Sequence, residues 1–196
     1  MNQNQLTSES CIRLASVYQL LSLLWGKEVT LDLLQQLNEP DLRDAIVNLG
    51  GSVPSEVSEP IVEELAIDYC QLLIGPKNHL PPVESVWVDG QFQAETAGSV
   101  TRYYELLPGF RANANSGMPD HIGTELQFMG ELFQYAAVQE NSEAYTSIAD
   151  QFYEKHLGWT ANFLQQVHAQ AQTDFYRGLA HVTQLFLNKD NRNEFA

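Results

Sequence analysis

The chain has 196 residues, of which 44% are hydrophobic and 18% charged, so it can bury a substantial core and does not have the composition of a disordered protein. Its 25 acidic and 10 basic residues give a formal net charge of −15, which disfavours nucleic acids and anionic membrane surfaces and favours cationic partners. The first ten residues contain no basic residue and no apolar run, and no apolar stretch is long enough to span a bilayer, so we expect a cytoplasmic protein without a secretory signal or membrane insertion.

The first part of the chain has apolar side chains spaced three and four residues apart, which is the pattern of amphipathic helices. Glycine and proline mark the expected ends of several of these helices, for example Gly26 and the pair Gly75-Pro76. Cys11 and Cys70 lie among apolar residues at helical spacing, so we expect two buried thiols rather than a disulfide. Four helices are expected here, over about 8–25, 31–37, 41–49 and 59–74.

Residues 76–91 are not expected to be helical, because they contain three prolines and an Asp-Gly turn signal. One short extended piece fits here, but no sheet follows from it. A further helix is expected over about 94–107. The loop after it, at about 108–119, is rich in Gly, Asn and Ser and is the best candidate for a hinge between two halves. Its length permits either a monomer or a domain-swapped dimer.

Helical spacing resumes in the last part of the chain. Asp120 is expected to begin a long helix, Gly158 interrupts the next helical stretch, and Thr173-Asp174 caps the last helix. No run of alternating apolar residues is long enough for a sheet. The periodicity therefore predicts an all-α fold class, a bundle of roughly eight to ten helices.

The common catalytic motifs do not occur in this sequence, which has no P-loop, no G-x-G-x-x-G, no G-x-S-x-G and no H-E-x-x-H. One polar constellation remains: Asp120-His121 with Glu125, in which His121 and Glu125 share a helix face because they are four residues apart. We expect no cofactor, no metal and no enzymatic activity, but this constellation still allows more than one interpretation.

Three interpretations of the constellation are open. In the first, Asp120 caps the helix and Glu125 fixes the tautomer of His121. In the second, the three side chains belong to a small metal- or nucleotide-dependent enzyme, although the Glu-x-x-His motif of helical di-metal sites does not occur. In the third, the acidic residues hold an arginine through charge-assisted hydrogen bonds.

Trp87 is a second candidate for binding. It follows two prolines closely, and Glu84 lies nearby in the sequence. A tryptophan in this setting is either a packing anchor or the aromatic wall of a groove that takes an apolar peptide.

Several short segments, together with their order along the chain, resemble those of a known protein family. They combine a helix that ends at Gly-Pro, a Glu-Ser-Val element, an Asp-His helix start and a helical tail, and they span roughly 14–187. In this order and spacing they resemble the TorD/DmsD/NarJ family of molybdoenzyme maturation chaperones, in its TorD-like branch. The segments are Tyr69–Pro76, Pro82–Trp87, Pro119–Ile122, Glu125–Met129, Phe152–Phe163 and Phe175–Ala180.

The resemblance implies a single all-helical domain, with an N-terminal bundle over about 1–107 and a C-terminal bundle over about 120–196, joined by the hinge loop at about 108–119. It implies a cytoplasmic chaperone of anaerobic respiration that binds the twin-arginine leader, the apo form, or both, of a molybdopterin oxidoreductase. Binding would delay export until the cofactor is inserted. The alternative within the family is a NarJ-type assembly chaperone, which acts on an apoenzyme that is not exported.

The resemblance also assigns candidate peptide-binding residues, which join the acidic constellation described above. Lys77 stands where some family members have an aromatic residue, so no aromatic contact is expected at that position. Charge reversal at Asp120 is expected to weaken leader binding without unfolding the domain. The candidate peptide-binding residues are Asp120, His121, Glu125, Glu84, Ser85, Trp87, Gly75 and Pro76.

Overall fold

A computed structural model describes residues 6–112, 117–139 and 142–188 of the chain. Across these residues the protein has ten α-helices, one π-helical turn and no strand, which confirms the all-α fold class. The chain divides into two compact units, and each is described by itself. The first unit comprises Met1–Gly26, Val83–Trp159 and Asn188–Ala196, and the second comprises Lys27–Pro82 and Thr160–Leu187.

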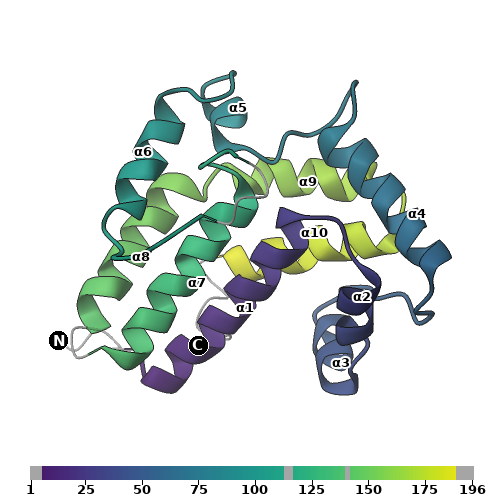
Figure 1. The fold of residues 1–196 in the computed structure, drawn as a ribbon, viewed down its shortest axis with the longest axis horizontal. Helices are drawn as coiled ribbons and strands as arrows, with labels where there is room; N and C mark the ends of the chain where they lie inside the picture. The colour runs from purple at the N-terminus through teal and green to yellow at the C-terminus, as the bar shows by residue number, and fades with distance from the viewer. Residues whose placement is uncertain (1–5, 113–116, 140–141, 189–196) are drawn as a thin grey trace. The chain divides into compact units, whose positions relative to one another are not determined.

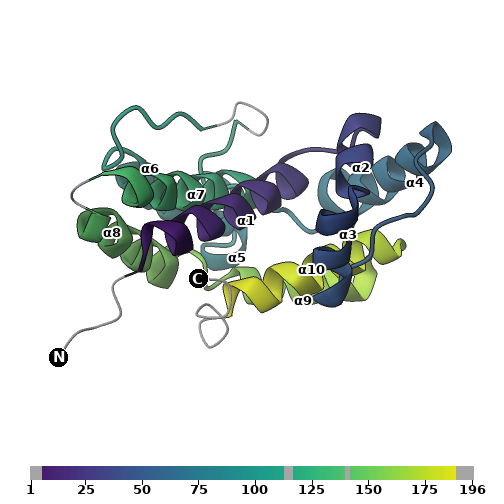
Figure 2. The ribbon, with the colours of Figure 1, turned by 90° about the horizontal axis from the view of Figure 1, so that it is seen from below.

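The first unit is organised around two long helices, α1 and α7, which lie side by side in Figure 1 and Figure 2. Two glycines of α7 allow the close approach: a Cβ on Gly123 would lie 2.9 Å from Gly26 Cα, and a Cβ on Gly130 would lie 3.3 Å from a backbone oxygen of α1. Ser22 Oγ also donates a hydrogen bond to the Gly123 carbonyl, at 2.6 Å. The helices of this unit are α1 (Ser8–Gly26), α5 (Glu84–Val88), α6 (Glu95–Tyr104), α7 (Ile122–Val138) and α8 (Ser142–His156).

Helix α7 forms the centre of the first unit, with α1 and α8 packed against it. Every residue from His121 to Gly130 is buried, so the first half of the helix has no solvent-facing side. Most helices bury one apolar stripe, and their polar residues face water. The sequence of α7 instead brings the polar side chains of Thr124, Glu125 and Gln127 into the interior, where each needs a partner.

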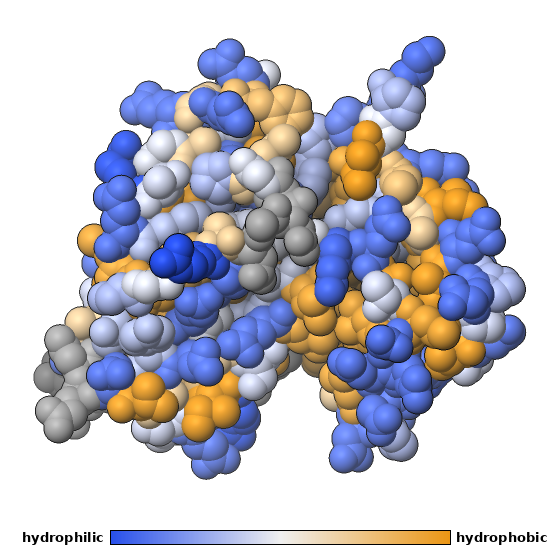
Figure 3. Space-filling model, in the orientation of Figure 1, coloured by the Kyte–Doolittle hydropathy of each residue, from blue (hydrophilic) through white to orange (hydrophobic). Residues whose placement is uncertain are grey.

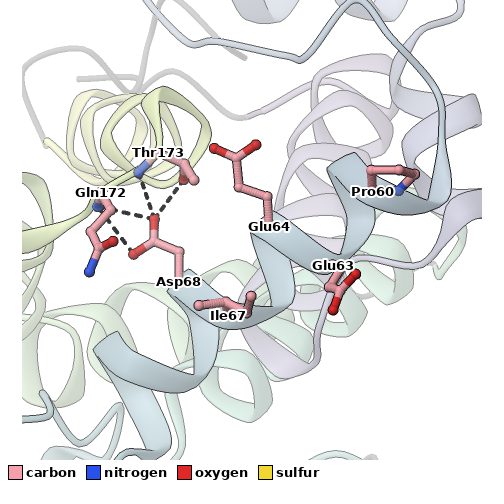
Figure 4. A pocket seen from close by; sticks show the side chains of 7 residues that line it. All are labelled: Pro60, Glu63, Glu64, Ile67, Asp68, Gln172 and Thr173. Carbon is pink, nitrogen blue, oxygen red and sulfur yellow. Dashed lines mark hydrogen bonds between the residues drawn. The ribbon is translucent and has the colours of Figure 1, made fainter.

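The second unit contains the π-helical turn and a capped C-terminal helix. Asp68 on α4 accepts hydrogen bonds from Gln172 N (3.1 Å), Thr173 N (2.8 Å) and Thr173 Oγ1 (2.6 Å), and thereby holds the start of α10 (Figure 4). Beside Asp68, the exposed carboxylates of Glu63 and Glu64 line an open groove (Figure 4). The elements of this unit are α2 (Leu31–Leu37), α3 (Pro40–Asn48), α4 (Glu59–Tyr69), the π-helical turn Cys70–Ile74, α9 (Thr160–Gln170) and α10 (Asp174–Leu187).

Two local expectations are corrected by the structure. Residues 84–88 form the short helix α5, although the prolines and the Asp-Gly signal predicted no helix there. Cys70 is exposed and its thiol donates to Glu28 Oε1 at 3.4 Å, whereas Cys11 is buried as expected. The buried face of this helical segment includes the charged residue Asp68, which a sequence pattern would place at the surface. Cys70 therefore lies on the exposed face of the segment.

The two compact units do not coincide with the expected N-terminal and C-terminal bundles. Both described parts of the loop at 108–119 belong to the first unit, and residues 113–116 lie outside the described residues. The second unit draws residues 27–82 and 160–187 from both expected bundles. The oligomeric state stays a prediction from the sequence.

The surface of each unit is mixed in character. On the face shown in Figure 3, hydrophobic residues reach the surface in separate patches between hydrophilic side chains. Among the helices within the described ranges, none combines the length and the apolar character needed to cross a membrane.

Candidate functional site

The two polar elements that the sequence singled out meet in the first unit. Val83 and His121 form an isolated antiparallel bridge, and Glu84 N donates to the Asp120 carbonyl at 2.9 Å. The Asp120 side chain accepts a second hydrogen bond, from Ser85 N at 2.8 Å. Asp120 therefore caps the start of α5 and not, as expected, the start of α7. This long-range pairing explains why a five-residue helix forms beside two prolines.

His121, not Asp120, is the N-cap of α7. Its Nδ1 accepts a hydrogen bond from Gly123 N at 3.0 Å, and its backbone is extended, as an N-cap requires. Burial lowers the pKa of His121 to about 4, against the opposing charge of Asp120. The imidazole is therefore neutral near pH 7, with Nδ1 as the acceptor. The expectation that Glu125 fixes the tautomer of His121 was wrong, because Gly123 N does so.

A buried hydrogen-bonded chain joins three helices of the first unit. His156 Nδ1 lies 2.9 Å from Glu84 Oε2, and His156 Nε2 lies 3.2 Å from Ser99 Oγ. The side chains of Glu84 and His156 are only 3% and 2% exposed. The imidazole also packs edge-on against the ring of Tyr103, at 5.3 Å between centroids. These contacts hold α5, α6 and the C-terminal end of α8 together.

Glu125 lies at the other side of Glu84 and is fully buried. Its Oε2 accepts a hydrogen bond from Trp159 Nε1 at 3.1 Å, and Trp159 stacks on Trp87 at 6.4 Å between centroids. Burial and the charge of Glu84 raise the pKa of Glu125 well above its ordinary value. Burial also raises the pKa of Glu84, although the hydrogen bond from His156 opposes this. Glu125 is therefore the neutral partner of the two.

Glu84, Asp120 and Glu125 together form what we call the carboxyl cluster, and it has more acceptors than donors. Asp120 Oδ1 and Glu125 Oε1 are buried without a hydrogen-bond partner, as is Ser85 Oγ. A buried polar atom without a partner costs about 1–3 kcal/mol. A proton on one of these carboxyls would provide one missing donor, and a ligand rich in donors would provide more.

An open cavity of about 330 Å³ reaches this cluster from the surface of the first unit. Its wall includes the buried side chains of Glu84, Ser99, His156 and Trp159. Lys155, which also lines it, stands 5.5 Å from the centroid of the Tyr103 ring. The other lining residues are Val88, Asp89, Glu95, Thr96, Arg102 and Gly158.

The hydrogen-bond order Ser99–His156–Glu84 is that of a serine nucleophile with its base and orienting acid. Catalysis would also need backbone donors for an oxyanion. Ser99 lies inside α6, where the neighbouring backbone N–H groups are used within the helix. In the described part of the chain, moreover, no three His, Cys, Asp or Glu side chains are grouped so that they could hold a metal ion. The arrangement can bind a group that donates hydrogen bonds.

The structure brings most of the expected residues together. Trp87 is half-buried and reaches the carboxyl cluster through Trp159. Gly75 and Pro76 belong to the second unit, where Gly75 N closes the π-helical turn on the Cys70 carbonyl at 2.7 Å. The expected residues found at or beside the carboxyl cluster are Glu84, Ser85, Trp87, Asp120, His121 and Glu125.

Three residues of the site were missed: Ser99, His156 and Trp159. Helical apolar spacing assigned His156 and Trp159 to the core, and the segment Phe152–Phe163, which resembles the family, contains both without marking either as a site residue. Nothing in the sequence distinguished Ser99 from other helical serines. Their roles depend on contacts with Glu84 and Glu125, which are far away in the sequence.

Several known proteins are similar to this chain in sequence. The sequence profile of the family described as nitrate reductase delta subunit matches residues 28–165. The chaperone protein TorD of Aliivibrio salmonicida is 27% identical over 90% of this chain and 92% of its own length. The chaperone protein YcdY of Escherichia coli K12 is 32% identical over 61% of this chain and 59% of its own length.

The fold is also similar to a solved structure. A crystal structure from Archaeoglobus fulgidus, of a protein assigned as a redox enzyme maturation protein, covers 96% of this chain with a TM-score of 0.63. The match extends over 98% of that protein, at 18% sequence identity. At this identity the likeness establishes the fold alone.

Proposed function

The chain belongs to the nitrate reductase delta subunit family, that of the TorD/DmsD/NarJ chaperones, and on this basis we propose that it binds the twin-arginine leader of a molybdopterin oxidoreductase. The relatives are named as chaperones, so the protein is a maturation chaperone and not an enzyme. It works in the cytoplasm, where it holds the client until the cofactor has been inserted and export can begin.

The observation that carries this proposal is the cavity with the buried carboxylate of Glu84 in its wall. A guanidinium group is permanently charged and offers five N–H donors in a planar fork. The carboxyl cluster has the complementary property, because Asp120 Oδ1 and Glu125 Oε1 lack donors. An arginine that enters the cavity would meet Glu84 first, with the other two carboxyls behind it.

Long-range charge favours the same ligand. The net charge of −15 attracts a cationic peptide and speeds its association, in a manner that salt weakens. Two cations, Arg102 and Lys155, do line the cavity. Lys155 Nζ stands over the Tyr103 ring at 5.5 Å from its centroid, a contact that favours keeping the ammonium group at the aromatic face.

The apolar part of a leader would meet aromatic side chains. Trp159 lines the cavity and stacks on the half-buried Trp87. Such a pair offers a rigid apolar surface to the residues that follow the arginines. Gly75 and Pro76 stay part of the proposal as separate peptide contacts in the second unit.

The proposal is tested by calorimetric titration of the protein with twin-arginine leader peptides from several molybdoenzymes, at low and moderate salt. Saturable binding of one leader is expected, and a twin-lysine version should bind at least tenfold more weakly because lysine lacks the planar fork. Glu84→Gln should weaken binding by a similar factor. Glu64→Gln removes the same charge from the exposed groove of the second unit and should change affinity by less than about twofold.

Failure of every leader would overturn leader binding and favour the NarJ-type function, in which the client is a whole apoenzyme that stays in the cytoplasm. The family that the chain matches is described as nitrate reductase delta subunit, and this description favours keeping the NarJ-type alternative. Capture of the apoenzyme by a protein that ignores its leader peptide would establish it. If Glu64→Gln lowers the affinity for the leader as much as Glu84→Gln does, binding depends on the total charge of the protein and not on the cavity.

A further inference from the structure

We propose that client binding in the cavity is coupled to the release of one proton from the Glu84–Glu125 pair, so that the client's cation and a proton compete for the same buried negative charge. This inference rests on the proposed function, because it takes a cationic client as the ligand. It adds a regulation that the binding site alone does not imply: the affinity for the client depends on pH.

The geometry makes Glu84 the link between the cavity and the interior. One side of its carboxyl faces His156, at 2.9 Å from Nδ1, and its charge is among the causes that raise the pKa of the buried Glu125. Glu84 lines the cavity, whereas Glu125 is fully buried behind it and is held by Trp159 Nε1. A cation that reaches Glu84 therefore acts on Glu125 without touching it.

The buried carboxyls outnumber the buried groups beside them that can carry a positive charge, so a proton on one of them reduces the excess of negative charge. Three carboxyls face one another, those of Glu84 on α5, Asp120 before α7 and Glu125 on α7. Of the two histidines here, His121 is neutral at pH 7 because burial lowers its pKa to about 4. His156 on α8 is the one imidazole that faces Glu84.

The other groups that face Glu125 do not supply a positive charge. Tyr104 on α6 is a neutral phenol, since burial and the nearby carboxyls raise its pKa. Trp159 donates one hydrogen bond but carries no charge. An ionised Glu125 beside Glu84 and Asp120 is therefore unfavourable until a cation arrives, and the proton on Glu125 takes the place of that cation.

The sign of the coupling follows from linkage. A guanidinium beside Glu84 stabilises the ionised form of the pair, so the shared proton passes to solvent as the cation binds. Lowering the pH protonates the Glu84–Glu125 pair again and weakens the binding of the client. The Kd rises by up to tenfold for each pH unit when one proton is exchanged. The chaperone would thus hold its client most tightly at higher pH.

The test is calorimetric titration of the full chain with the twin-arginine leader peptide, in phosphate and in Tris at the same pH and ionic strength. These buffers differ in ionisation enthalpy, so a released proton appears as a difference in heat that reports the number of protons exchanged. Between a half and one proton is expected to be released near pH 7, and the Kd should rise as the pH is lowered. Equal heats in both buffers with an affinity that does not change with pH would overturn the inference and leave leader binding intact.

A matched variant assigns the proton to its residue. Glu125→Gln keeps an oxygen that can accept from Trp159 Nε1 and an amide that can donate to Glu84, so it mimics the protonated acid. The variant should bind the leader more weakly than the wild type does and with no buffer-dependent heat, while Glu64→Gln should release the proton as the wild type does. Proton release that persists in Glu125→Gln would refute the assignment.

A measurement on the free protein keeps the inference testable if Glu125→Gln does not fold. Infrared spectroscopy of the wild-type protein near pH 7 should show the carbonyl band of a buried protonated carboxylic acid, and this band should disappear when the leader is added. Absence of the band in the free protein would overturn the inference. Failure of the leader to bind at all would be a failure of the proposed function, and the inference would fall with it.

Discussion

Replacing His121 by asparagine should remove a large part of the acid sensitivity of the fold. Asparagine can accept the same hydrogen bond from Gly123 N at the start of α7, and it is among the best N-cap residues, but it does not titrate. Burial lowers the pKa of His121 from 6.5 to about 4. Between these values the unfolded chain takes up the proton and the folded chain does not, so the stability that depends on neutral His121 is full above about pH 6.5 and is lost as the pH falls toward about 4.

The size of this effect follows from the same two values. At about 1.4 kcal/mol for each pH unit, the lowering from 6.5 to about 4 corresponds to about 3 kcal/mol. This is a large share of the 5–15 kcal/mol that is typical of a domain. Urea unfolding of wild type and His121→Asn, followed by tryptophan fluorescence at a series of pH values, gives the free energy of unfolding of each. The difference between them should be constant above about pH 7 and should shift by about 3 kcal/mol in favour of the variant by about pH 4.

The comparison cancels the other titrating groups, which are present in both proteins. An exposed histidine on α9 provides the control, because His168→Asn should give a stability curve parallel to that of the wild type. A difference between His121→Asn and wild type that stays the same from about pH 7 to about pH 4 would refute the reasoning, since His121 would then not be held neutral by burial.

Three further predictions test the packing and the chemistry of the two units. Gly123→Ala should lower the free energy of unfolding by about 1–3 kcal/mol, because its Cβ would lie 2.9 Å from the backbone of α1. Gly98→Ala, whose Cβ would meet only the end of an arginine side chain at 3.7 Å, should raise it by about 0.5–1 kcal/mol; urea unfolding that ranks the two in the opposite order would contradict this packing. Asp68→Ala should lower it by about 1–3 kcal/mol, since the N–H and hydroxyl donors at the start of α10 lose their acceptor, and an unchanged urea midpoint would argue against the cap. A thiol reagent should modify Cys70 but not Cys11 in the native protein and both after unfolding, and modification of two thiols in the native state would show that Cys11 is not buried.

The helices of this protein were largely predictable because long amphipathic segments carry their own signal. The first helix was expected over about 8–25 and is found over Ser8–Gly26, and the last begins at the expected Thr173-Asp174. The short helix α5 was not predictable, because five residues are too few for periodicity. It depends on hydrogen bonds that Glu84 N and Ser85 N donate to Asp120, which is 35 residues away from Ser85.

The sequence pointed to some of the residues that meet at the candidate site but not to their arrangement. Resemblance to a family pointed to the Asp-His and Glu-Ser-Val elements, and the structure brings them into contact. The sequence did not show that Asp120 caps α5 while His121 caps α7, because adjacent polar residues offer the same kind of acceptor. His156 was missed because its partner Glu84 is 72 residues away, and a histidine at apolar spacing is usually a core residue.

The order in which the two units use the chain has a consequence for biosynthesis. The second unit is assembled from residues 27–82 and 160–187, and most of the first unit lies between them. A nascent chain leaves the ribosome with its N-terminus first, so when residue 82 has emerged neither unit has all of its helices. The first unit has all of its helices only with His156, and the second only with Leu187.

Many of the native contacts therefore join segments made at different times, which slows folding relative to a bundle of consecutive helices. The early helices α1 and α4 must wait with their apolar faces uncovered for α7 and α10. During that interval the nascent chain has the exposed apolar surface that other proteins present to chaperones. This maturation chaperone therefore lacks part of its own fold until almost all of these helices have been translated.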